Sequence, residues 1–489
     1  MQLLRRIVLL SIVATSACMA DGISLNVFID SITSRHPLIR QQEIAPRIAR
    51  TRRQGYTTAQ GWRIRVNPRY SHVEPISTSP FTPTRIDEAT LDASAARAIW
   101  NTGGDLSFQW RSGYTDQDLP TIQIPGPSGS QDISTGLPRL YEHSFSIGYT
   151  QPLLRNRGGG LDRLQYEVGG LEVTVADLRS AEAIEEFLAR VARQFLSWSN
   201  LAEQVVILEE RLELARRERE HLEERFEVNL IDKADLLRAE NAYRNVRQQT
   251  VLARSRRDAE AARLATLSRW EEVADMAPDY DIYQVIELPG EDSAYRMVES
   301  GGREVEALRI QRDKLDRQLA ANEETALPQL DLNVSVGVQG GNDAFSESVE
   351  TPKPRYAIGL LFRQQLGASA AEVDMQVTRL RRRQLHEREE NLLLEIRASV
   401  RSLLRRMRDL EEILELNRKT IESARERWKE EQDLYRQGRG QLVWVIEAQD
   451  LEQNARLNYA QNATTYHQLL FEFRELTDQL LTGSDDEGR

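Results

Sequence analysis

The stretch Phe226-Glu227-Val228-Asn229-Leu230 interrupts a long helical segment, and helix-forming sequence resumes at Asp235. About two hundred residues later, Tyr435-Arg436-Gln437-Gly438-Arg439 interrupts a second long helical segment, which resumes through 444–449. In both copies an aromatic residue stands three positions before the turn residue. A repeat of this length, with a helix, a turn and a helix each time, predicts a duplicated architecture.

The helices that lead into these breaks carry apolar residues at alternating intervals of four and three. These residues are Leu201, Val205, Leu208 and Leu212 in the first copy, and Leu403, Met407, Leu410 and Leu414 in the second. This spacing is a heptad seam. Because the breaks are short, we expect the returning helices, 232–268 and 441–481, to run antiparallel to their partners. Asn229 and Gly438 are suited to the left-handed conformation that ends a helix.

Before each long helix the apolar period changes from helical to two. The second half alternates over 330–338 and 356–362, and the first half over 64–73, 106–110, 145–149 and, more weakly, 91–100. Alternating segments of about ten residues are typical of membrane β-barrels. The turn at Thr102-Gly103-Gly104 suggests an extra hairpin in the first half. The segments 74–88 and 114–140 have the composition of loops, and one helix is expected before each strand region, at 25–59 with a kink at Pro46 and at 292–327.

The N-terminus predicts export. Arg5 and Arg6 precede an apolar run, and small residues follow it up to Ala20, which is the pattern of a signal peptide. Two readings of Cys18 stay open: Ser16-Ala17-Cys18 resembles a bacterial lipobox with Cys18 as the lipidated residue, or cleavage after Ala20 removes it. Since Cys18 is the only cysteine, disulfides are excluded. No later run is apolar enough for a transmembrane helix.

Composition and motifs argue against catalysis and nucleic-acid binding. The chain has 64 Lys and Arg against 76 Asp and Glu, a net charge of −12, which disfavours a phosphate-binding surface. Its six histidines are scattered without metal-ligand spacing. We therefore expect no enzymatic activity, no cofactor, no metal and no nucleic-acid partner.

The chain resembles the TolC-like outer-membrane efflux proteins over nearly all of its exported length. The resemblance is carried by Arg225-Phe226-Glu227-Val228-Asn229-Leu230 with Asp235, by 435–448, and by Gln151-Pro152-Leu153-Leu154 between a strand and a long helix. It implies a mainly α fold with membrane β-barrel strands, in which a homotrimer forms one α-helical tunnel and one shared barrel. Family barrels take four strands from each protomer, so an extra hairpin would be a departure.

The resemblance also implies roles for the two hairpin tips, as a tunnel entrance and as the contact for a periplasmic adaptor (membrane fusion) protein. The candidate residues are Phe226, Val228, Asn229, Leu230, Asp235, Tyr435, Gly438, Arg439, Trp444 and Glu447. Asp235, Tyr435 and Glu447 match positions in or near the family's constriction. The chain departs from the family at Trp444, where an acidic residue is usual, and at Gly440, where an arginine can occur.

These observations predict the organisation of the whole chain. The expected parts are a signal peptide (1–20), a first structural repeat (21–272) with its tip near 226–235, a connector (273–292), a second structural repeat (293–482) with its tip near 435–444, and a disordered tail (483–489). Each repeat is expected to contain a helix, barrel strands and a long coiled-coil hairpin.

The predicted function is a passive outer-membrane channel of a tripartite efflux or type I secretion system in a Gram-negative-type bacterium, with a large periplasmic part. Its expected partners are the adaptor, an inner-membrane RND or ABC transporter and outer-membrane lipid. The alternative is an exported periplasmic coiled-coil adaptor or scaffold. The duplicated hairpin argues against this alternative, because adaptors usually carry one hairpin per chain. A periplasmic enzyme would need a catalytic site that the sequence does not offer.

Overall fold

The computed structural model describes residues 22–76, 79, 81–126, 129–133, 139–350, 352–367 and 369–481. The predicted signal peptide with Cys18 and the predicted tail 483–489 lie outside the described residues. The chain forms two compact units. One consists of Met1–Ile44, Arg179–Val305 and Asn391–Arg489 as far as these are described, and the other of Ala45–Leu178 and Glu306–Glu390.

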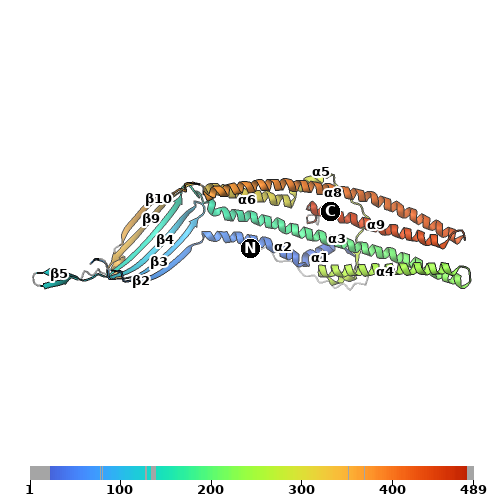
Figure 1. The fold of residues 1–489 in the computed structure, drawn as a ribbon, viewed down its shortest axis with the longest axis horizontal. Helices are drawn as coiled ribbons and strands as arrows, with labels where there is room; N and C mark the ends of the chain where they lie inside the picture. Colours follow the sequence, from blue (N-terminus) through green and yellow to red (C-terminus); the bar gives the residue numbers. More distant parts are fainter. Residues whose placement is uncertain are drawn as a thin grey trace, which may run out of the picture. The chain divides into compact units, whose positions relative to one another are not determined.

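Long helices dominate the described residues, as predicted (Figure 1). The helices of four or more turns are α2 (Pro37–Tyr56), α3 (Gly160–Glu227), α4 (Lys233–Ser268), α6 (Arg303–Thr325), α8 (Ala370–Arg436) and α9 (Leu442–Leu476). Helices α3 and α8 contain 68 and 67 residues, and each is followed after a short turn by its returning helix. The predicted pair of helical hairpins is therefore confirmed.

The single helices predicted before each strand region are wrong, because each is two helices. In the first repeat α1 (Leu25–Arg35) ends before Pro37, whose ring pushes the preceding His36 into extended backbone. Pro46 lies inside α2 instead of marking the break. In the second repeat α5 (Glu291–Gly301) and α6 are separated at Gly302. The duplication thus extends to a paired helix at the start of each repeat.

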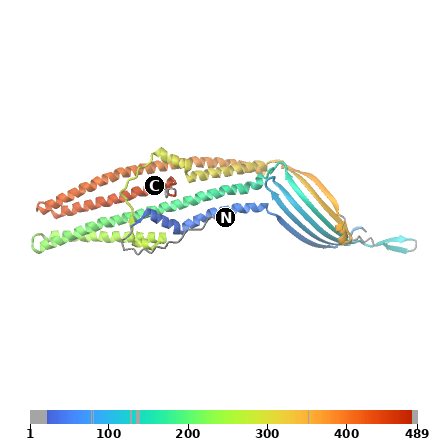
Figure 2. The ribbon, with the colours of Figure 1, turned by 180° about the vertical axis from the view of Figure 1, so that it is seen from behind.

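The sheet contains six antiparallel strands in the order β10-β9-β7-β4-β3-β2, which lie side by side in both ribbon views (Figures 1 and 2). Their bounds are β2 (Arg63–Val73), β3 (Arg85–Ile99), β4 (Gly104–Asp118), β7 (Leu140–Pro152), β9 (Gln329–Asn342) and β10 (Lys353–Arg363). The extra first-half hairpin is confirmed as β3–β4. The predicted loops 74–88 and 114–140 are too long, since residues 85–88 and 114–118 belong to strands. The second of these segments also contains a small hairpin formed by β5 (Ile122–Gly126) and β6 (Gly129–Ile133).

The turn of the extra hairpin is held against the segment that leads into α3. The backbone N–H of Gly158 donates to the carbonyl oxygen of Thr102 at 3.2 Å, and the Gln151 side chain donates to the same oxygen at 2.9 Å. Gly103 and Gly159 both have positive φ, and a Cβ on either would collide with the backbone of the facing segment. These contacts make β3–β4 an integral part of the sheet.

The helical unit has two large apolar clusters, each built from residues of both repeats. Phe28 and Ile32 of α1 pack with Phe195 and Trp198 of α3, all almost completely buried. A second cluster joins α8 and α9 through residues such as Met407. The heptad positions Val205, Leu208, Leu403, Met407 and Leu414 are buried, so the predicted seams are confirmed.

His467 makes the stability of this core depend on pH. It is 1% exposed, and its Nδ1 lies 2.9 Å from the Tyr280 hydroxyl oxygen. Burial lowers the pKa of His467, and the charge of Arg474 lowers it further. The folded protein therefore holds this imidazole neutral, and its contribution to stability is present above the unfolded pKa of about 6.5 and is lost as pH falls through the lowered pKa.

We expect the melting temperature to fall between pH 7.5 and pH 5.5, and the His467→Gln variant to show a smaller fall, measured by thermal unfolding of the purified protein. His386→Gln is the matched control, because the His386 side chain is 62% exposed. Equal pH dependence in the wild type and His467→Gln would show that this histidine does not couple protonation to folding.

Candidate functional site

The first hairpin tip is closed by a left-handed asparagine. Asn229 has φ of 59° and follows the last helical residue, Glu227, by two positions. The N–H of Leu230 donates to the carbonyl oxygen of Arg225 at 2.8 Å, and the N–H of Asn229 donates to that of Phe226 at 2.9 Å. This pair of bonds is the Schellman motif, which satisfies carbonyl groups that the end of a helix leaves free.

The second tip repeats the same geometry at the same spacing. Gly438 has φ of 73°. The N–H of Arg439 donates to the carbonyl oxygen of Leu434 at 2.9 Å, and the N–H of Gly438 donates to that of Tyr435 at 3.0 Å. Gly440 also needs to be glycine, because a Cβ there would lie 2.9 Å from the backbone nitrogen of Tyr435. The departure from the family at Gly440 thus has a local steric reason.

A small apolar cluster joins the two tips. Leu222 of α3, Ala239 of α4 and Leu442 of α9 are buried together, and Tyr435 of α8 packs against them. Burial raises the pKa of Tyr435, the nearby Arg225 opposes this rise, and Asp235 adds to it. Sequence reasoning identified Tyr435 and Asp235 as candidate site residues, but it did not predict that Leu222, Ala239 and Leu442 are buried together beside them.

The other predicted residues are mostly solvent-exposed. Val228, Leu230 and Trp444 expose 63%, 66% and 46% of their surface. Asn229, Gly438, Arg439 and Glu447 are also exposed, while Phe226 and Asp235 are half-buried. Asp235 forms an ion pair with Arg238 at 2.7 Å within α4. The tips therefore present apolar side chains to solvent beside polar ones, which is typical of a docking surface.

A layer of buried polar groups lies behind the tips, and sequence reasoning did not find it. Arg211 and Gln449 are 5% and 2% exposed, and the Nη2 of Arg211 lies 3.1 Å from the Asp450 carboxylate. Among the described residues, the Arg211 Nε and Nη1 atoms have no hydrogen-bond partner. Burial raises the pKa of the neighbouring Glu218. A cavity of about 370 Å³ lies here, lined in part by Trp428. Buried polar groups that lack partners weaken the helical packing in this layer.

The six-stranded sheet has two chemically distinct faces. Register and alternation place one row from each strand on the same face, which we call the apolar face. It includes Ile64 and Val66 on β2, Leu91 on β3, Phe108 and Trp110 on β4, Phe145 and Ile147 on β7, Val334 and Val336 on β9, and Ile358 and Leu360 on β10. The opposite, polar face carries mainly Ser, Thr, Asn, Gln, Gly and charged residues.

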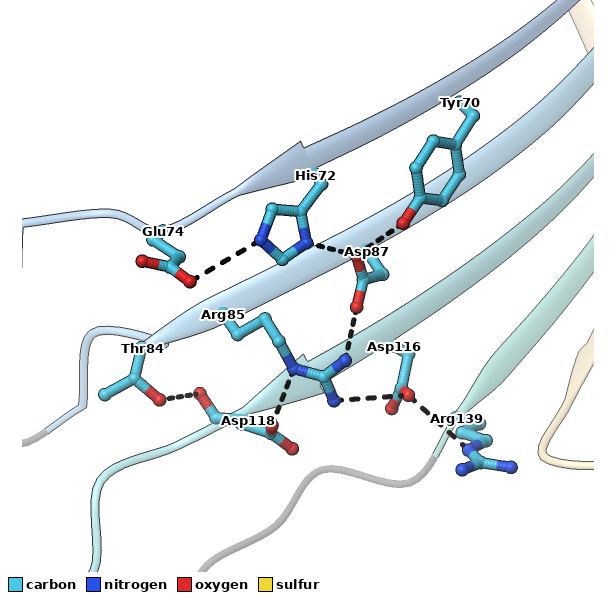
Figure 3. Close-up of polar contacts among 9 residues, drawn as sticks. All are labelled: Tyr70, His72, Glu74, Thr84, Arg85, Asp87, Asp116, Asp118 and Arg139. Carbon is cyan, nitrogen blue, oxygen red and sulfur yellow. Dashed lines mark hydrogen bonds and ion pairs between the residues drawn. The ribbon is translucent and has the colours of Figure 1, made fainter.

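A polar cluster ends the apolar face where β2 and β3 meet their connecting loop (Figure 3). Asp87 accepts a hydrogen bond from the Tyr70 hydroxyl at 3.0 Å and lies 2.6 Å from the His72 Nδ1. Arg85 forms ion pairs with Asp87 and, at 2.8 Å, with Asp118. All five side chains are thus tied into one network.

The apolar face has a defined height. On the apolar row of β3, Asp87 stands at one end and Arg97 at the other, with Leu91 and alanines between them. Ten residues at a rise of about 3.3 Å span roughly 33 Å along the strand. At the tilt of about 35–45° found in membrane barrels, this corresponds to roughly 25 Å along the membrane normal, which equals the usual apolar band.

Within the ranges that the structure describes, no group of three or more His, Cys, Asp or Glu side chains could hold a metal ion. No described helix has a stretch long and apolar enough to cross a membrane.

Comparison with known proteins agrees with this geometry. Residues 85–268 match the model of the outer membrane efflux protein family. The fold is similar to that of the outer membrane protein VceC from Vibrio cholerae, with 10% sequence identity, a TM-score of 0.64, and coverage of 93% of this chain and 95% of that one. No curated protein sequence matches the chain.

Two further solved structures have similar folds. The Campylobacter jejuni CmeC outer membrane channel has 12% identity and a TM-score of 0.61, with coverage of 93% of this chain and 85% of that chain. The Neisseria gonorrhoeae MtrE outer membrane channel, in its open state, has 13% identity and a TM-score of 0.61, with coverage of 93% and 89%.

Two long helical hairpins combined with a sheet that has one apolar face define the fold class of the outer-membrane channels. The matched segment runs from the first residue of β3 to the last residue of α4, so the chain resembles the outer membrane efflux protein family in sequence there and the outer-membrane channels in fold over most of its length. The resemblance predicted from the hairpin tips is therefore confirmed.

The left-handed turn at Asn229 gives a direct test of the tip geometry. Asn229→Val is expected to destabilise the tip by about 1–2 kcal/mol, because a β-branched side chain is disfavoured at positive φ, and Asn229→Gly is expected to be neutral or stabilising. The measurement is protease cleavage at 226–235 in the folded protein. Glu227→Val, at the preceding helical position, is the control. Equal cleavage of Asn229→Val and the wild type would contradict the prediction.

Proposed function

We propose that this protein is a passive exit duct in the outer membrane of a Gram-negative-type bacterium, serving a tripartite efflux or type I secretion system. The duct forms and breaks no bond and consumes no nucleotide, so the energy comes from an inner-membrane RND or ABC transporter. The single observation that carries this proposal is the apolar face of the sheet, which has the height of a bilayer and is polar on its opposite side.

The open edges of the sheet support assembly into a homotrimer. Among the described residues, β2 and β10 each have one neighbouring strand. Lipid does not tolerate unpaired backbone groups, so these edges need partners. β2 starts and β10 ends at the helical side of the sheet, so β2 of one copy meets β10 of the next antiparallel. Three copies with six strands each would close a barrel of eighteen strands, wider than the family's barrels with four strands per protomer.

The hairpin tips are the proposed contact with a periplasmic adaptor and the proposed tunnel entrance. Val228, Leu230 and Trp444 supply apolar surface for docking. Asp235 and Glu447 would form rings of carboxylates in a trimer, which would favour cations at the entrance. Gating is proposed to arise in the buried polar layer around Arg211 and Gln449, because buried polar groups without partners there weaken the helical packing.

The membrane orientation of the sheet can be tested on one strand. Leu91 lies near the middle of the apolar row of β3, and Thr90 lies on its polar face. Leu91→Arg is expected to destabilise the membrane-inserted protein by about 2–4 kcal/mol, whereas Thr90→Arg should have little effect. The measurement is denaturant unfolding of the protein in lipid vesicles. Equal effects of the two substitutions would argue against a lipid-facing apolar row.

The docking role of the tips can be tested separately. Leu230→Asp is expected to abolish export while leaving the trimer intact, because a carboxylate would have to be buried in the adaptor contact. Gly438→Pro should act similarly, because proline cannot adopt positive φ. The measurements are drug or protein export in cells and oligomer mass in detergent. The exposed substitution Arg436→Gln serves as the control. Loss of the trimer in Leu230→Asp would show a structural role instead of docking.

A further inference from the structure

The polar face of the sheet has its charges segregated by strand. The two edge strands carry six basic residues and no acidic residue on this face: Arg63, Arg65 and Arg69 on β2, and Lys353, Arg355 and Arg363 on β10. The four inner strands carry five acidic residues, Glu88, Asp92, Asp105, Glu142 and Asp331, and one basic residue, Arg111. The edges are thus positive and the centre is negative.

The basic residues of the inner strands and of the edge strands differ in their ion-pair partners. Arg111 is paired with Asp92, its Nε lying 2.5 Å from the carboxylate oxygen. Arg63 reaches across β3 to Asp105 at 3.4 Å. For the other five edge residues, no carboxylate of the described part of the chain lies within ion-pair distance, and all six edge side chains are exposed. The basic edges are therefore not neutralised within one copy.

Assembly brings these rows together. This step rests on the proposed trimer, in which β2 of one copy pairs with β10 of the next. Adjacent strands lie about 4.8 Å apart. A register slip of one residue would turn the apolar row of one strand away from lipid, so any acceptable register leaves both basic rows on the polar face. Like charges on paired strands repel each other, so bound anions would stabilise the junction between the two basic rows.

We propose that each junction between copies forms a basic seam on the lumen side of the barrel, and that this seam binds multivalent anions in transit. The site exists only in the assembly, because β2 and β10 of neighbouring copies each supply half of it. Guanidinium groups suit phosphate and carboxylate oxygens, which they can bind through two parallel N–H bonds. The ligand class is therefore a soluble solute bearing several phosphate or carboxylate groups.

The seam predicts a polarity along the duct. The entrance carboxylates Asp235 and Glu447 favour cations, whereas the seams favour anions at the strand end. A multivalent anion should therefore act more strongly when it is added on the strand side. At about 0.1 M salt the seam acts within roughly 10 Å of the wall, so its effect should weaken as the ionic strength rises.

The experiment measures ion currents through purified trimers in planar bilayers at about 0.1 M KCl, with inorganic tripolyphosphate as the probe. We expect tripolyphosphate added on the strand side to reduce the wild-type current. In the triple variant Arg65→Gln, Arg69→Gln, Arg355→Gln, the half-blocking concentration should rise by at least about tenfold. The matched control Arg111→Gln removes a basic residue that is already paired on the same face. It should change the half-blocking concentration by less than about twofold.

The possible outcomes separate the seam from the duct. Channels that conduct but are blocked equally in the wild type and the triple variant, or are not blocked at all, would overturn the seam and leave the duct standing. A wild-type protein that forms neither trimers nor channels would overturn the proposed function itself. If the triple variant alone fails to assemble, the single variant Arg355→Gln replaces it, with an expected rise of about threefold.

Discussion

The structure depends on one constraint: every strand of the sheet must keep its apolar row on the same face. Side chains alternate along a strand with a period of two, so a slip of one residue in any pairing would exchange the two faces of that strand. The six strands meet this constraint across five pairings, including the three in which β3 or β4 takes part. The bilayer-high apolar face follows from it, and so does the confinement of most charged side chains to the other face.

In the helical part, the way in which the helices end is repeated in the two hairpins. Both long helices end in the same Schellman motif, once with Asn229 and once with Gly438 at the left-handed position. Their partners α4 and α9 also end at residues with positive φ, Arg269 and Asp478. A non-glycine residue at positive φ costs free energy, and hydrogen bonds that cap the helix ends, such as those from the N–H groups of Leu230, Trp270 and Gln479, offset this cost. The duplication is thus conserved in backbone geometry where the side chains have diverged.

The two repeats differ most in the strands they contribute to the sheet, and this difference changes the charges on the polar face. The first repeat contributes β2, β3, β4 and β7, while the second contributes only β9 and β10. The inserted β3–β4 brings three of the five acidic residues of the polar face, Glu88, Asp92 and Asp105, into the interior of the sheet. The basic residues remain at the edges. In the proposed trimer, the wider barrel and the segregated charge pattern therefore share one structural origin.

The sequence by itself determined the two long helical hairpins, their tips and most of the strands, because these depend on local periodicity and turn residues. It also indicated the extra hairpin through Thr102-Gly103-Gly104. It did not locate the helix breaks at His36 and Gly302, the full length of β3, or the buried layer of Arg211 and Gln449. Only the tertiary structure decided these, because burial, strand pairing and the approach of distant side chains depend on contacts between segments that no local pattern encodes.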